Sequence, residues 1–128
     1  MLTLRSEYGE GETWITLAIL ADVNGVSLTQ SGVSSIALKV YDVSAQDGVV
    51  LYSAMPAVGS TIFDTLQLDY GWDRDATGYN FRFSIPESAL SVAQKGGRVY
   101  LAEYVVQRVA DGPKSVQHWI SVRSAVSV

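Results

Sequence analysis

Hydrophobic and polar residues alternate along most of the chain, and this spacing is typical of β-strands rather than helices. The alternation is most regular between residues 79 and 85, where the odd positions are aromatic or aliphatic and the even positions are Asn80, Arg82 and Ser84. Because successive side chains of a strand point to opposite faces, the odd positions are predicted to face a core and the even positions to face away from it. The regular pattern predicts a central strand.

A second strand is predicted between residues 12 and 20. Its expected core face carries three aliphatic residues, Ile15, Leu17 and Ile19. Trp14 then falls on the opposite face, together with Thr16 and Ala18. An exposed Trp on a strand is a frequent anchor for a protein partner, although a neighbouring loop could bury it equally well. Trp14 is therefore a candidate partner-binding residue.

A third strand is predicted between residues 35 and 43. Its inward positions are three aliphatic residues, Ile36, Leu38 and Val40. The alternate positions include Lys39 and Tyr41, a charge and a phenol, which belong on the wetter side of a sheet. Tyr41 is a second candidate for contact with a partner.

Two long strands are predicted near the end of the sequence, over residues 98–109 and 115–126. The segment between them contains Asp111-Gly112, which supplies the positive backbone dihedral of a tight reversal, and Pro113, which fixes the re-entry angle. The two strands are therefore expected to form a hairpin. Alternation in the last strand predicts four inward residues, Val116, His118, Ile120 and Val122. Trp119 points the other way and is a third candidate contact residue.

Shorter segments complete the set. Residues 2–7 are predicted to pair along a sheet edge, residues 49–53 to follow a reversal at Asp47-Gly48, residues 62–68 to form a strand, and residues 86–90 to form one helical turn. Asn24-Gly25 marks a further reversal. Strands separated by Gly-containing turns, without a helical repeat between them, indicate an all-β, immunoglobulin-like Greek-key sandwich of about seven to nine antiparallel strands. Residues 1–128 are predicted to form this one domain.

Composition narrows the functions that such a domain can perform. The chain has 128 residues and no cysteine, which excludes disulfides, thiolate catalysis and sulfur-ligated metals. Only 17% of its residues are charged and 48% are hydrophobic, so much of the surface is neutral and rich in hydroxyl groups. Such a surface favours contact with other proteins. The net charge of -4 argues against binding to nucleic acid, and neither a secretory signal nor a membrane span is expected.

Catalytic chemistry is hard to place in this sequence. His118 is the only histidine, so a two-histidine metal site is impossible and any Ser-His-Asp triad would have to use it. Because it lies in a predicted apolar row, His118 is expected to be a core residue with one ring nitrogen bonded to backbone or water. No catalytic residue, metal or cofactor is predicted, and the chain is not expected to be an enzyme.

The acidic segment at residues 69–75 is the best candidate for a small ligand. Asp73 and Asp75 could converge on a cation, and Tyr70 or Trp72 could stack on a sugar ring. The segment lacks the third oxygen ligand and the distal bidentate Glu of a calcium loop. A carbohydrate-binding module is thus the alternative function from a different class. The plainer interpretation is a solvated loop whose Trp72 covers the open end of the sandwich.

Several stretches in order carry a resemblance to a known family. They are residues 9–17, 22–28, 31–41, 63–64, 78–86 and 96–104, and they extend over nearly the whole chain. In this order they resemble the Ig-like domain at the amino terminus of baseplate upper proteins, and related small structural proteins, of tailed-phage virions. Their residues are mostly turn and core residues, and no catalytic residue is transferred.

The resemblance implies a virion component, made in the host cytoplasm, that binds other virion proteins and copies of itself. Baseplate proteins of this kind continue beyond the sandwich, whereas the present sequence holds the sandwich alone. We therefore expect a capsid decoration, or cement, protein that docks on the shell in many copies, with a tail or baseplate component as the alternative. Four residues are expected to contact partners: Trp14, Tyr41, Trp72 and Trp119. No contact with nucleic acid or membrane is expected.

Overall fold

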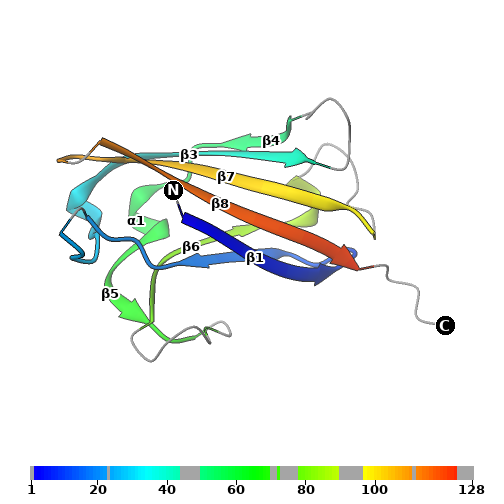
Figure 1. The fold of residues 1–128 in the computed structure, drawn as a ribbon, viewed down its shortest axis with the longest axis horizontal. Helices are drawn as coiled ribbons and strands as arrows, with labels where there is room; N and C mark the ends of the chain where they lie inside the picture. Colours follow the sequence, from blue (N-terminus) through cyan, green and yellow to red (C-terminus); the bar gives the residue numbers. More distant parts are fainter. Residues whose placement is uncertain are drawn as a thin grey trace.

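The computed structural model describes residues 2–22, 24–43, 50–69, 72, 78–89, 97–110 and 112–123. These residues form eight strands in two sheets (Figure 1). The strands are β1 (Leu2–Gly9), β2 (Trp14–Ala18), β3 (Val33–Asp42), β4 (Val50–Ala54), β5 (Ile62–Gln67), β6 (Tyr79–Ile85), β7 (Val99–Arg108) and β8 (Gly112–Arg123). The helical turns are η1 (Gln30–Gly32), α1 (Val58–Thr61) and η2 (Glu87–Ala89).

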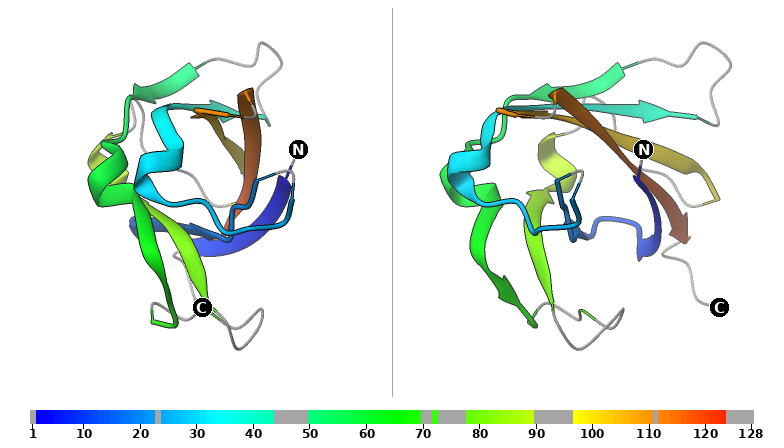
Figure 2. Two further views of the ribbon diagram at one scale, coloured as in Figure 1. Left: turned by 90° about the vertical axis from the view of Figure 1, so that its left-hand side faces the viewer. Right: turned by 60° about the vertical axis from the view of Figure 1, so that its left-hand side comes forward.

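The larger sheet has five strands in the order β1-β8-β7-β3-β4, and the smaller has three in the order β2-β6-β5. Strand β1 runs parallel to β8, whereas the other strand pairs are antiparallel. Figure 2 shows the two sheets as separate layers on either side of the interior. The predicted all-β, two-sheet architecture is confirmed. The edge position of β1 and the central position of β6 are confirmed as well.

The hairpin of β7 and β8 forms as predicted, with Leu101 opposite Trp119 and Glu103 opposite Gln117. Gly112, at φ +75°, adopts the backbone conformation for which glycine was expected. The last strand nevertheless begins at Gly112 rather than at Ser115, so Pro113 lies inside it. Proline fits there because β1 pairs with β8 only from Val116 onward, and β8 is still an edge strand at Pro113.

The face of β2 was predicted wrongly. Trp14, Thr16 and Ala18 are buried at 0%, 0% and 1% exposure, whereas Ile15, Leu17 and Ile19, the predicted core face, are only half-buried. A core position suits Thr16 because its hydroxyl donates to the Phe83 carbonyl at 2.8 Å and lies 2.6 Å from the Tyr104 hydroxyl. Since the Thr16 proton goes to Phe83, the Tyr104 hydroxyl donates to Thr16, and this bond joins the two sheets.

Aromatic rings fill the space between the sheets beside this bond. The Trp14 and Tyr100 ring centroids lie 5.2 Å apart, and Phe81 meets Tyr104 edge to face at 4.8 Å. Such tilted and edge-on contacts are favourable for aromatic pairs. Buried aliphatic residues from both sheets complete the core, among them Ile36, Leu38, Val40, Ile62, Ile85, Val106, Val116 and Ile120.

The end of the sandwich near residues 20–28 is held by Asn80, which was expected to face away from the core. Its side chain is 0% exposed, because the chain on either side of the turn at Asn24-Gly25 places Leu20 and Leu28 against it. Asn80 Oδ1 accepts from the Leu20 amide at 2.7 Å, and Nδ2 donates to the carbonyls of Leu20 and Leu28 at 2.8 and 2.9 Å. A polar residue is therefore buried here with its hydrogen bonds formed.

The shorter predicted elements have mixed outcomes. Strands β4 and β5 and the turn η2 lie where they were expected, and Gly25, in the predicted reversal at Asn24-Gly25, has a φ of +82°. The α1 turn at Val58–Thr61 was not predicted. The expected reversal at Asp47-Gly48 lies outside the described residues.

Candidate functional site: the outer face of the five-stranded sheet

One row of side chains crosses the whole outer face of the five-stranded sheet. The strand registers pair Arg5 with Trp119, Trp119 with Leu101, Leu101 with Tyr41, and Tyr41 with Val50. Neighbours paired in this way have side chains on the same side of the sheet. They alternate with inward core residues such as Tyr100 and Ile120, so the row points away from the other sheet. We call these five residues the aromatic row.

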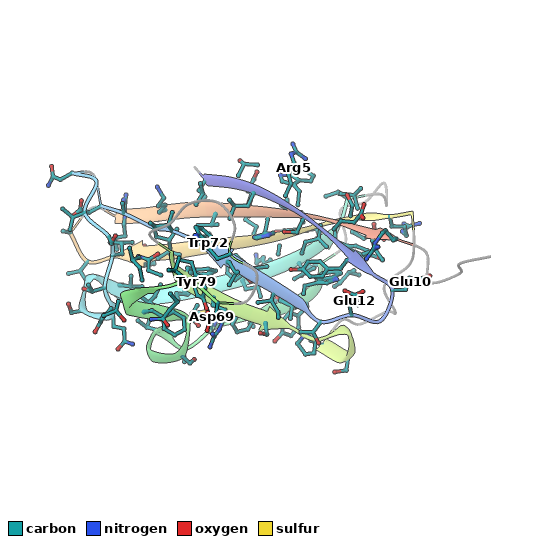
Figure 3. The ribbon with its side chains drawn as sticks, turned by 90° about the horizontal axis from the view of Figure 1, so that it is seen from below. Arg5, Glu10, Glu12, Asp69, Trp72 and Tyr79 are labelled. Atoms are coloured by element: carbon teal, nitrogen blue, oxygen red, sulfur yellow. The ribbon has the colours of Figure 1, made fainter. Side chains whose placement is uncertain are left out.

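The centre of the aromatic row is apolar and closely packed. Leu101 is only 9% exposed although no other strand of the described residues lies over it; Trp119 and Tyr41 flank it on the adjacent strands. At one end of the row Val50 is 42% exposed. At the other end the Arg5 guanidinium carbon lies 5.8 Å from the Trp119 ring centroid, within cation–π range. Figure 3 shows Arg5 projecting from β1.

A polar row lies directly beside the aromatic row. Thr3, Gln117, Glu103, Lys39 and Ser53 follow one another across the same five strands. Gln117 Nε2 donates to Glu103 Oε2 at 3.2 Å, which fixes the carboxylate on the face. Lys39 is exposed and opposite Glu103 in register, yet neither forms an ion pair with another described residue. Each of these charges is therefore open to a partner.

Further apolar side chains border both rows. Val99 and Val105 lie on β7 at alternate positions from Leu101, and Val43 follows β3 with an exposure of 37%. Next to Lys39, a shallow groove of about 390 Å³ is lined by Ala37, Leu38, Lys39, Ser53, Ala54 and Met55. Met55 is 69% exposed at its mouth. The outer face thus combines an apolar centre with a few charges, as protein-binding surfaces do.

The four predicted contact residues lie in three different places. Tyr41 and Trp119 lie on either side of Leu101 in the aromatic row. Trp14 does not reach any surface: it is 0% exposed and packs against Tyr100 between the sheets. The prediction that Trp14 contacts a partner is therefore wrong for the folded chain, because β2 turns the face that carries it inward.

Trp72 belongs to a separate cluster beside β5 and β6. Figure 3 shows Asp69, Trp72 and Tyr79 close together and away from Arg5. The Tyr79 hydroxyl donates to Asp69 and accepts from Arg82 Nη1 at 3.2 Å, and its ring lies 5.9 Å from that of Trp72. Burial, followed by the hydrogen bond to Asp69, raises the pKa of Tyr79. Of the predicted ligand residues, Tyr70, Asp73 and Asp75 lie outside the described part.

Arg82 ties this cluster to the neighbouring strand. Its guanidinium carbon lies 4.9 Å from the ring centroid of Phe63, and Phe63 meets Tyr79 edge to face at 5.9 Å. Asp69 is itself exposed, and Trp72 is half-buried. The cluster therefore offers one aromatic edge and one carboxylate to solvent, and its described residues include no group of three metal-ligating side chains.

His118 occupies the inward position that was predicted for it, at 2% exposure. Its Nε2 lies 2.9 Å from Ser6 Oγ, so this ring nitrogen bonds the Ser6 side chain. Ser6 lies on β1 two residues after the buried Leu4, so its side chain points to the same inward face of the strand. The pair joins the edge strand to β8 beneath the surface, and a substrate on the outside of the chain does not reach this imidazole.

Sequence reasoning missed Leu101, Val50 and Arg5 as members of the site. One signal for Leu101 is present in the sequence: in residues 99–108, both the odd and the even positions are largely apolar. A strand with two apolar faces is either buried on both sides within the fold or has one face that a partner can cover. Arg5 and Val50 join the row only through the pairing of β1 with β8 and of β3 with β4. The residues around each of them in the sequence do not predict this pairing.

Comparisons of the chain with protein-family models, with curated proteins and with solved structures give no match. Within the described residues, no helix has the length and apolar character needed to cross a membrane. The function is therefore inferred from the geometry of the outer face and from the sequence resemblance.

Proposed function

We propose that the chain is a non-enzymatic structural protein of a phage virion that docks on the capsid through the outer face of its five-stranded sheet. The observation that carries the proposal is the aromatic row, in which Trp119, Leu101 and Tyr41 are adjacent on three strands of the outer face. A capsid decoration protein performs no chemistry and needs only such an adhesive surface.

The aromatic row has the composition of a protein-binding hot spot. Trp, Tyr and Arg are the residues whose removal most often weakens protein interfaces, and here Trp119, Tyr41 and Arg5 lie in one line. They are attached to paired strands, so little backbone freedom is lost when a partner binds. The polar row beside them supplies charges that select among partners.

The strand order supports an immunoglobulin-like sandwich. In that fold, with strands named A to G along the chain, one sheet holds C, F and G and the other holds B, E and D. The orders β8-β7-β3 and β2-β6-β5 correspond to these two sets, with β4 as an added strand beside β3. In this chain the first strand pairs with the last rather than with β2. The order favours the family resemblance noted in the sequence.

A virion role is favoured by that same resemblance to Ig-like domains of tailed phages. Capsid decoration is the proposed location, and a tail or baseplate position is the alternative. To test the assignment, antibodies against the purified domain are applied to density-gradient-purified phage particles in immunogold electron microscopy. We expect label on the capsid; label on the tail selects the alternative, and absence of the protein from particles refutes a virion role.

A binding experiment tests the surface itself. Particles from a phage that lacks the gene are mixed with purified wild-type chain, with Trp119→Ala and with Trp72→Ala as the matched control. We expect Trp119→Ala to reduce the affinity roughly tenfold or more, as for a hot-spot residue, and Trp72→Ala to leave it unchanged. Loss of binding for Trp72→Ala alone would assign docking to the cluster at Asp69 instead.

A carbohydrate-binding function is the second candidate, because exposed Asp69 and half-buried Trp72 lie beside one another, with the Trp72 amide donating to the Asp69 carbonyl at 3.2 Å. An aromatic ring next to a carboxylate is a common way to hold a sugar ring. Binding on a glycan array that is lost in Trp72→Ala and kept in Trp119→Ala supports this function. Absence of any glycan binding by the wild-type chain removes it.

A further inference from the structure

We infer that one partner of the outer face is a second copy of the same chain, in a symmetric face-to-face pair whose two-fold axis runs parallel to the strands between β3 and β7. This inference rests on the proposed function, since it takes the outer face to be a docking surface. It concerns the free chain: the second copy and the capsid compete for the same face, so a chain docked on the capsid is not paired in this way. The pairing follows from the cross-strand registers and from the positions of two charges on the face.

The symmetry determines which residues meet. A two-fold axis that lies between two stacked sheets, parallel to β3 and β7, places β7 of one copy over β3 of the other without a shift along the strands. Residues in register within one chain then face each other across the interface. The pairing of Lys39 with Glu103 in one sheet becomes two reciprocal contacts between the copies, and so does the pairing of Tyr41 with Leu101.

The charges are complementary in this arrangement. Lys39 of each copy faces Glu103 of the other, and Gln117 already holds the Glu103 carboxylate at 3.2 Å. Neither charge is used in an ion pair with a described residue of its own chain. Each copy therefore presents an open cation where its partner presents an open anion. Complementary charges of this kind steer association and fix the register of an interface.

The apolar side chains match as well. Two strands away from the axis, β8 of one copy lies over β4 of the other, so Trp119 faces Val50. Next to the axis, Tyr41 faces Leu101, and Val105 faces Ala37. Stacked sheets cross at roughly 30°, so the residues nearest the axis make the closest contacts. These are the pairs of Lys39 with Glu103 and of Tyr41 with Leu101.

A two-fold axis perpendicular to the strands does not give this match. Consider such an axis placed over the row of Leu101 and Tyr41. It reverses the strand direction of the second copy, so that Glu103 of one copy faces Val99 of the other and Lys39 faces Val43. Both charges are then covered by apolar side chains without a partner, which is unfavourable because each charge loses its hydration and gains no opposite charge. The charge pattern therefore favours the parallel axis over the perpendicular one.

The overlapping area fits a weak pair. With the axis between β3 and β7, strands β8, β7, β3 and β4 lie opposite strands of the other copy, and β1 falls outside the overlap. Strand β3 has 10 residues and β4 has 5, which at about 3.4 Å each extend about 34 and 17 Å. At about 4.8 Å per strand the four strands cover roughly 500 Å² per partner, below the ~800 Å² of a standard interface and in the range of weak, reversible association.

Charge reversal tests the pairing without a foreign partner. Sedimentation equilibrium on the purified chain at about 10 to 200 µM is expected to show a dimer. Lys39→Glu and Glu103→Lys should each weaken dimerisation roughly tenfold or more, because both reciprocal contacts become repulsive. An equimolar mixture of the two variants should form a heterodimer, since each then faces the opposite charge. Ser84→Glu, exposed on the other sheet, is the control and should dimerise like wild type.

Folding of each variant is checked by circular dichroism, and the double variant Lys39→Glu/Glu103→Lys provides a second arm. It restores opposite charges within the chain and between copies, so it should dimerise like wild type. The inference is overturned if the wild-type chain and the mixture stay monomeric at about 200 µM, or if both single variants dimerise as well as wild type. Binding of a monomeric chain to gene-deleted particles, lost in Trp119→Ala, would leave the proposed function standing while self-pairing fails.

Discussion

Asn80 provides the sharpest test of how the fold is held together, because a single side chain connects β6 to residues 20–28. Replacing Asn80 by Ala removes one acceptor and two donated hydrogen bonds. The Leu20 carbonyl keeps the Leu28 amide as a partner at 2.9 Å. The substitution therefore removes the Asn80 hydrogen bond from two backbone groups, the Leu20 amide and the Leu28 carbonyl, for which the described part of the chain provides no other bond.

The expected cost follows from these two groups. A buried backbone group left without a partner costs about 1 to 3 kcal/mol, and the truncated side chain leaves a small cavity. Together they predict a loss of about 3 to 5 kcal/mol for Asn80→Ala, a large share of the roughly 5 to 15 kcal/mol typical of a domain. Asn24→Ala, at an exposed turn position, is the control and should change stability by less than about 0.5 kcal/mol.

Urea unfolding followed by tryptophan fluorescence measures both values. Asn80→Asp adds a second test, because it keeps an acceptor for the Leu20 amide but turns an oxygen toward the carbonyls of Leu20 and Leu28. Its deficit relative to wild type should be larger at pH 7 than at pH 4, where a protonated carboxyl can donate. A cost below about 1 kcal/mol for Asn80→Ala, or equal to that of Asn24→Ala, would refute the assigned role.

Three further predictions concern the core and its ionisation. Trp14→Ala should cost about 3 to 5 kcal/mol of unfolding free energy because it empties the core, whereas Trp119→Ala should cost less than half of that; equal costs would contradict the inward face of β2. A double-mutant cycle of Tyr104→Phe and Thr16→Val should give a coupling of about 1 kcal/mol, and additive effects would show that the bond between the sheets is not formed. Burial raises the pKa of three tyrosines, Tyr8, Tyr79 and Tyr104. Because the folded state then favours the neutral phenol, stability should be retained below about pH 10, the pKa of an unfolded tyrosine, and fall as the pH rises through the raised values; urea midpoints that are constant from pH 9 to 11.5 would contradict this.

Local pattern was sufficient where one face of a strand was clearly more apolar than the other. The hairpin of β7 and β8 and the inward row of Ile36, Leu38 and Val40 were predicted because alternation and turn residues agree there. Position 112 shows the same agreement, since Gly112 adopts the positive φ that the reversal requires.

Local pattern failed where a distant residue decides the environment. Trp14 and Thr16 alternate with aliphatic residues, so both faces of β2 look acceptable in a core, and the larger aliphatic set was chosen. The hydroxyl of Tyr104, far along the chain, makes Thr16 acceptable inside. Asn80 is likewise buried because Leu20 and Leu28 lie against it, and the residues next to Thr16 and Asn80 in the sequence do not predict either environment.

The candidate site was predicted residue by residue but not as a surface. Tyr41 and Trp119 were each placed on the wetter side of a strand, which the structure confirms. Their adjacency depends on Leu101 between them and on the order β8-β7-β3, and strand order is set by how the whole chain folds. The self-complementary relation of Lys39 and Glu103 emerges only once that register is known.

Hydroxyl-radical footprinting read by mass spectrometry tests docking through the outer face most directly. Oxidation of Trp119, Tyr41 and Met55 is compared between the free chain at low micromolar concentration and the chain in purified phage particles, with Trp72 as the internal reference. We expect these three residues to be protected in particles while Trp72 is oxidised to the same extent in both states. Unchanged oxidation of Trp119, together with protection of Trp72, would contradict docking through this face.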